Sequence, residues 1–91
     1  MPLRVEFYGL ARQWAGVSEV AVDLAPGEVR FASALQLVAR AVPRFAEHCL
    51  VSNRLHAALA ANLDGERFIV DPTTPIRDGQ SLLILSADAG G

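Results

Sequence analysis

Four consecutive apolar residues near the carboxyl end, Leu82-Leu83-Ile84-Leu85, constrain the fold of this chain more than any other feature. They follow an Asp-Gly turn at residues 78–79 and predict a strand that is apolar on both of its faces. Such a strand usually belongs at the centre of a sheet. The strands that flank it must therefore come from earlier in the chain.

Four further segments have the pattern of strands. The first two alternate apolar and polar side chains, and the Pro-Gly pair at residues 26–27 ends the second of them. The other two flank Asp64-Gly65, a dipeptide typical of hairpin turns. The four segments are residues 3–7, 20–24, 57–63 and 66–70.

One segment has the period of a helix instead. Apolar residues recur at three- and four-residue spacing over residues 31–42, and Pro43 ends the run. Residues 10–16 predict an irregular loop or a short turn of helix, residues 71–75 predict a loop, and residues 43–56 have no clear pattern.

This order of elements predicts an α+β fold, in which one main helix packs on one face of a mixed five-stranded sheet. If the last strand pairs with the first, the two run parallel, because a helix and a hairpin lie between them in the chain. Residues 86–91 follow the last strand as a short tail without periodicity.

The composition is that of one soluble domain. Ninety-one residues with a net charge of −2 suffice for one hydrophobic core. The chain has no apolar run long enough to cross a bilayer and no signal-peptide pattern, so we expect a cytoplasmic protein without a membrane or nucleic-acid partner. Cys49 is the only cysteine, and no Cys/His pair has zinc-ligand spacing. We expect Cys49 to be a buried small residue, and His48 and His56 to be surface or structural residues.

The chain ends on Gly90-Gly91. Glycine has no Cβ, so this pair can enter a narrow channel, and the terminal carboxyl carbon is open to attack from either side. The alternative is that the two glycines are only an unstructured chain end without a function. All eight basic residues are arginines, so no lysine of the same chain can capture an activated tail.

The order of elements resembles that of the β-grasp, or ubiquitin-like, fold, and the chain resembles the MoaD/ThiS family of sulfur-carrier proteins. The resemblance spans nearly the whole chain and is poorest over residues 43–56. It depends on the order and spacing of several short stretches relative to the double-glycine end. These stretches are Val5-Glu6-Phe7-Tyr8-Gly9, Ala11-Arg12, Asn62-Leu63-Asp64-Gly65-Glu66, Thr74-Pro75-Ile76-Arg77-Asp78-Gly79, and Leu83-Ile84-Leu85 followed by Ala89-Gly90-Gly91.

The resemblance implies a protein that is a substrate of other enzymes and acts through its tail. In the family, a partner related to the ubiquitin-activating enzymes uses ATP and magnesium to adenylate the terminal carboxylate. Sulfur from a persulfide donor replaces the AMP, and a sulfur-accepting synthase consumes the thiocarboxylate. Gly91 would carry the adenylate and then the sulfur, and Gly90 would let it reach the partner's active site. The chain itself would bind no cofactor or metal.

The resemblance also divides the chain into a β-grasp domain, residues 1–87, and a flexible tail, residues 88–91. By likeness to ubiquitin-like domains, Leu82 and Ile84 face the helix, while Leu83 and Leu85 face outward. Partners of the family dock on that outward face, although two exposed leucines can also be ordinary surface. The predicted partner-binding residues are Leu83, Leu85, Asp88 and Ala89.

Among the members of the family, the chain is most similar to the small subunit of molybdopterin synthase, which implies a role in molybdenum-cofactor biosynthesis. Thiamine, cysteine and tungsten-cofactor pathways are the alternatives. Two residues depart from the family pattern: Ser86 stands where proline is common, and Asp88 where an aliphatic residue is common. A charge at Asp88 inside a channel requires a complementary arginine or lysine on the partner.

Two other classes of function fit the same sequence. In the first, the chain is a ubiquitin-like modifier, whose activated Gly91 is joined to a lysine of another protein. In the second, it is an interaction domain whose glycine tail is incidental. The first shares the adenylate step with sulfur carriage, and the second requires no chemistry at the tail.

Overall fold

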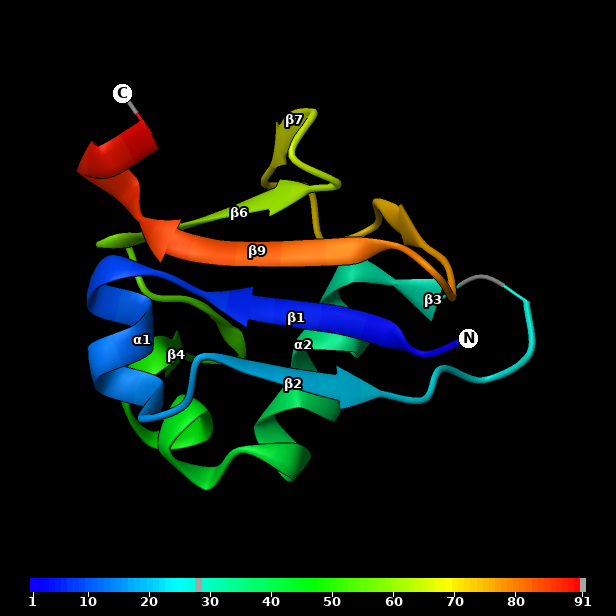
Figure 1. Ribbon diagram of the computed structural model, residues 1–91, viewed down its shortest axis with the longest axis horizontal. Coiled ribbons are helices and arrows are strands. Elements are labelled where there is room, and N and C mark those ends of the chain that lie inside the picture. The colour runs from blue at the N-terminus through cyan, green and yellow to red at the C-terminus, as the bar shows by residue number, and fades with distance from the viewer. Residues whose placement is uncertain (28, 91) are drawn as a thin grey trace.

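The computed structural model describes residues 1–27 and 29–90, and a five-stranded sheet forms its centre (Figure 1). Strand β9 is the middle strand; it runs parallel to β1 and antiparallel to β6. The mixed sheet and the central place of the last strand are therefore as the sequence predicted. In spatial order the strands are β2 (Glu19–Val22), β1 (Leu3–Phe7), β9 (Ser81–Ser86), β6 (Leu59–Leu63) and β7 (Arg67–Ile69).

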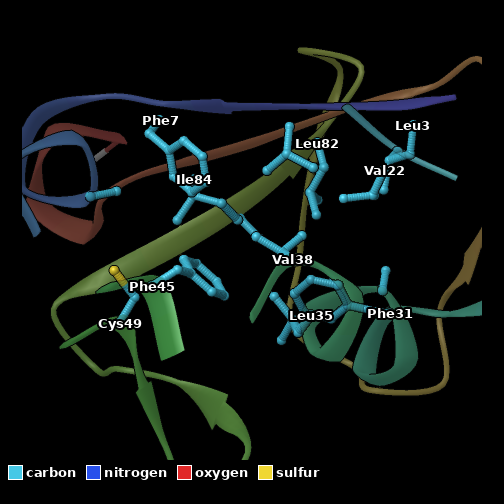
Figure 2. Close-up of a cluster of buried hydrophobic side chains, with 14 of the residues drawn as sticks. Leu3, Phe7, Val22, Phe31, Leu35, Val38, Phe45, Cys49, Leu82 and Ile84 are labelled. Carbon is cyan, nitrogen blue, oxygen red and sulfur yellow. The ribbon is translucent and has the colours of Figure 1, made fainter. Parts of the chain in front are cut away.

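The main helix, α2 (Phe31–Ala41), covers one face of the sheet (Figure 1). Its buried side chains recur at three- and four-residue spacing, because only that stripe faces the sheet. Figure 2 shows the core that forms between the two layers. The helix contributes Phe31, Leu35 and Val38 to it, β1 contributes Leu3 and Phe7, and β9 contributes Leu82 and Ile84.

A short helix, α1 (Gly9–Ala15), connects β1 to β2 and is the second of the two alternatives predicted there. Ala11 and Ala15 are buried one turn apart, so the helix packs through its small residues. Gly16 ends it with φ 78°, and its N–H donates to the Arg12 carbonyl at 2.9 Å.

The segment without a sequence pattern supplies a second part of the core. A π-helical turn, η1 (Phe45–Cys49), buries Phe45 and Cys49 completely. The Phe45 ring packs against Phe7 with 5.7 Å between ring centroids. A small hairpin, β4 (Leu50–Val51) and β5 (Arg54–Leu55), follows and leads into β6.

Most predicted strands and the helix begin or end one or two residues away from their observed bounds, and two differences are larger in consequence. The predicted loop at residues 71–75 runs into β8 (Pro75–Ile76), which pairs antiparallel with β3 (Val29–Arg30). This pair forms because Ile76 is buried in the core, which holds β8 beside β3. Ser86, predicted to begin the tail, is instead the last residue of β9 and is buried.

Candidate functional site

The carboxyl end of β9 is fixed from both sides. The Ser86 Oγ accepts a hydrogen bond from the Leu10 N–H at 2.9 Å. The Ala87 N–H donates to the Ala58 carbonyl, just before β6, at 2.8 Å. The chain therefore leaves the sheet at a defined point between α1 and the start of β6.

Gly9 makes this anchor possible. A Cβ at Gly9 would lie 2.5 Å from the Ser86 Oγ, which is closer than side chains tolerate. Its φ of 55° is also in the left-handed region that favours glycine. Both requirements come from the tertiary arrangement, since 77 positions in the chain separate the two residues.

The residues after β9 begin with a single 3₁₀ turn, η2 (Ala87–Gly90), beyond the end of the sheet (Figure 1). Asp88, one of the predicted partner-binding residues, is exposed there. The backbone of Ala89 and Gly90 belongs to this turn, and Gly91 lies outside the described residues. The role assigned to Gly91 and Gly90 stays a prediction.

The face of the sheet opposite α2, here called the outer face, carries the other predicted residues. Leu82 and Ile84 are fully buried, whereas Leu83 and Leu85 are half-buried on the other side of β9. The predicted parity of the strand is confirmed. Their role in partner binding stays a prediction.

The register adds two residues to the outer face that the sequence analysis missed. Asn62 on β6 stands opposite Leu83 on β9, and Phe68 on β7 stands opposite Asn62. The Phe68 side chain is 52 % exposed, whereas Asn62 is only 9 % exposed. The hairpin turn at Asp64-Gly65 was the signal that could have placed Phe68 and Asn62 side by side, but the exact pairing was needed to do so.

On the other side of Leu83 the outer face is acidic. Glu6 of β1 stands opposite Leu83, and the Tyr8 hydroxyl donates a hydrogen bond to the Glu6 carboxylate. This hydrogen bond, which favours the protonated phenol, raises the pKa of Tyr8. The outer face therefore offers an apolar centre with a carboxylate at its side.

Cys49, His56 and His48 lie away from the outer face, and their contacts are those of structural or surface residues. Burial raises the pKa of the Cys49 thiol to about 11, so the nucleophilic thiolate is scarce at neutral pH. The His56 ring packs edge-on against Trp14, and its Nδ1 accepts the Ala58 N–H at 2.9 Å. His48 is exposed beside Glu47.

Residues 1–27 and 29–90 hold no group of three histidine, cysteine, aspartate or glutamate side chains that could bind a metal. The same residues include no helix with the length and apolar character needed to cross a membrane.

A mixed five-stranded sheet with its last strand in the centre, beside the first, and one helix across it is the β-grasp, or ubiquitin-like, fold. No family model matches the chain, and no curated protein sequence matches it. Solved structures match it closely in three dimensions, and the likeness predicted from the sequence is confirmed at the level of the fold.

Three of these structures are informative. SAMP1 from Haloferax volcanii has a TM-score of 0.80 at 18% identity, with 100% of each chain covered. The putative molybdopterin converting factor, subunit 1, from Pyrococcus furiosus has 0.72 at 19% identity, with 94% of this chain and 97% of that one covered. A chain of the Amycolatopsis orientalis BexX/CysO complex has 0.71 at 18% identity, with 98% and 99% covered.

Proposed function

We propose that this chain is a sulfur carrier and that the Gly91 carboxylate is its working group. The observation that carries the proposal is the junction at Ser86. There the central strand of a β-grasp domain ends, held by the hydrogen bond from the Leu10 N–H to the Ser86 Oγ. The two glycines follow within five residues. A domain built this way holds the start of its tail, at Ser86 and Ala87, at a defined place relative to the outer face. Leu83 and Leu85 would then dock the partner that acts on the tail.

The chemistry must begin with activation, because a carboxylate repels nucleophiles and has no good leaving group. A carboxylate oxygen of Gly91 attacks the α-phosphorus of ATP, and pyrophosphate leaves. A persulfide sulfur then attacks the acyl carbon, and AMP leaves. A thiol that cleaves the resulting acyl disulfide releases the thiocarboxylate and forms a disulfide with the donor. The sequence has no phosphate-binding glycine loop, so ATP and magnesium belong to the adenylating partner.

We place the carrier in molybdopterin biosynthesis, with a molybdopterin synthase large subunit as the sulfur acceptor. The name of the Pyrococcus furiosus neighbour supports this pathway. The charge of Asp88 requires that the partner supply an arginine or lysine where the tail enters. If the sulfur acceptor is a different enzyme, the pathway would be thiamine, cysteine or tungsten-cofactor synthesis instead.

A ubiquitin-like modifier is the second candidate function. It is favoured by SAMP1, the neighbour with a TM-score of 0.80. The abbreviation is spelled out as small archaeal modifier protein 1 for another solved neighbour, from Methanosarcina acetivorans. In this case the adenylate at Gly91 leads to an amide with a lysine of another protein. The two functions share their first step and differ in what attacks the acyl carbon.

Two measurements test the proposal. The purified chain is incubated with a ubiquitin-activating-type adenylating enzyme, ATP and magnesium, and an AMP ester is expected at Gly91. The chain is then isolated from its own cell for mass spectrometry. Replacement of one oxygen by sulfur at Gly91 supports the carrier, and conjugates of higher mass support the modifier. A folded chain that forms no AMP ester contradicts both.

A further inference from the structure

A concave surface lies on the helix side of the sheet. It is a groove of about 400 Å³ between the start of α2 and strand β6. Most of its wall is apolar, and a cavity of this volume is large enough to hold several side chains of a ligand. Phe31 and Leu35 of α2, residues 53–57, Ile69 and Pro72 contribute to the wall.

The edge of β6, and not only its side chains, forms part of this groove. Successive side chains of a strand point to opposite faces, yet Leu59, Ala60 and Ala61 all line the groove. Strand β7 pairs with residues 61–63 only. No residue of β7 therefore stands opposite Leu59 or Ala60, and that half of β6 presents its backbone edge to the groove.

The hydrogen bonds of β6 show which polar groups point to this edge. The Ala58 carbonyl and the Asp64 N–H bond to Ala87 and Ser81 on the β9 side, at 2.8 and 2.7 Å. Residues of a strand alternate in direction, so the polar groups of Leu59 point to the opposite side. The Leu59 N–H donates to the His56 carbonyl at 2.9 Å, which leaves the Leu59 carbonyl facing the open edge.

The fold keeps this edge open. After Ile69 the chain leaves the sheet for the start of α2, where the Pro72 and Thr74 carbonyls accept the N–H groups of Ala32 and Phe31 at 3.0 and 2.8 Å. These are among the first N–H groups of the helix, which have no partner within the helix itself. If β7 continued along β6, they would lose these partners.

The groove also carries a positive charge. Arg54 lines it, and within residues 1–27 and 29–90 no carboxylate lies at ion-pair distance from its guanidinium. A ligand that matches the groove would therefore have an extended backbone, apolar side chains and one acidic residue.

We propose that this groove binds an extended peptide segment of another protein, which adds to the open half of β6 as a further strand. A backbone N–H of the peptide would donate to the Leu59 carbonyl, and alternate apolar side chains would pack against Phe31 and Leu35. An acidic side chain would pair with Arg54. Ala87 also lines the groove, so the segment would lie beside the root of the tail. This goes beyond the proposed function, because it requires no reaction at Gly91.

The test uses the ¹⁵N-labelled full chain and a blocked synthetic peptide, Asp-Val-Thr-Val-Thr, followed by amide chemical shifts. We expect saturable shifts at Leu59, Ala61 and Leu35, and none at Glu19–Val22 on the opposite edge of the sheet. A peptide with proline at its centre, which lacks the N–H, should bind more weakly. A lysine in place of the aspartate should weaken binding about three- to fivefold, as expected for an exposed ion pair.

Charge reversal provides the matched control. Arg54→Glu should invert the preference between the aspartate and lysine peptides, whereas Arg12→Glu on α1 should leave it unchanged. Three results would overturn the proposal: no shift at millimolar peptide, equal shifts at both sheet edges, or shifts at β6 that follow the concentration of the chain itself without peptide. The last would make a second copy of the chain the occupant. No adenylating enzyme is used, so the outcome is independent of the tail chemistry.

Discussion

At the scale of single residues, the anchor of the tail depends on the absence of one methyl group. A Cβ at Gly9 would lie 2.5 Å from the Ser86 Oγ, whereas a Cβ at Gly65 would have nothing within 4 Å, and both glycines have positive φ. Gly65→Ala should therefore cost only the left-handed backbone conformation, about 1–2 kcal/mol. Gly9→Ala should cost about 1–3 kcal/mol more, because Ser86 must move. Urea denaturation of both variants measures the difference. Equal losses would mean that Ser86 gives way freely.

A second prediction at this scale concerns the Cys49 thiol. Burial raises its pKa from 9.0 to about 11 in the folded chain, against a smaller opposing effect of Arg44. The folded state thus keeps its proton to higher pH than the unfolded state. The unfolding free energy should be unaffected by this group below about pH 9 and should fall as the pH rises toward 11. Cys49→Ala should lack this decline. If the free energy of unfolding has the same pH dependence in both proteins, the pKa of the Cys49 thiol is not raised by folding.

At the scale of elements, the two faces of β9 have different tasks. Ile84 is fully buried and Leu85 is half-buried, although they are neighbours in the chain. Ile84→Ala should lower the free energy of unfolding by about 2–5 kcal/mol, and Phe7→Ala on the adjacent strand by about 3–5 kcal/mol. Leu85→Glu should change it little but weaken binding to the adenylating partner. A large drop in the melting temperature of Leu85→Glu would contradict this division.

The elements also show how far the sequence could be interpreted. Strand β9 and helix α2 could be predicted because their apolar periodicity records burial along the chain itself. The turn η1 and strand β8 could not, because Phe45 and Ile76 are buried by partners far away in the sequence. In the candidate site, the resemblance to ubiquitin-like domains indicated that Leu83 and Leu85 face outward, because alternation along the strand does not say which pair is buried. Phe68 and Asn62 needed the register of the hairpin.

At the scale of the whole molecule, the proposed function separates the folded domain from its working end. Deleting Gly91 should abolish formation of the AMP ester, because the chain is then shorter by one residue, about 3.5 Å of reach. The thermal unfolding of the shortened chain should be unchanged. A variant with one alanine added after Gly91 is one residue too long instead of one too short. If the shortened chain is adenylated as fast as the full one, the position of the carboxylate does not matter.

The sequence by itself determined the central last strand, the helix and the double-glycine end, because apolar spacing and glycine content are local properties of the chain. Only the tertiary structure decided that Ser86 belongs to the sheet, that Asn62 lies between Leu83 and Phe68, and that half of β6 keeps an open edge. Each of these depends on hydrogen bonds and contacts between residues that are distant in the chain or paired across it. No local pattern records such a partner.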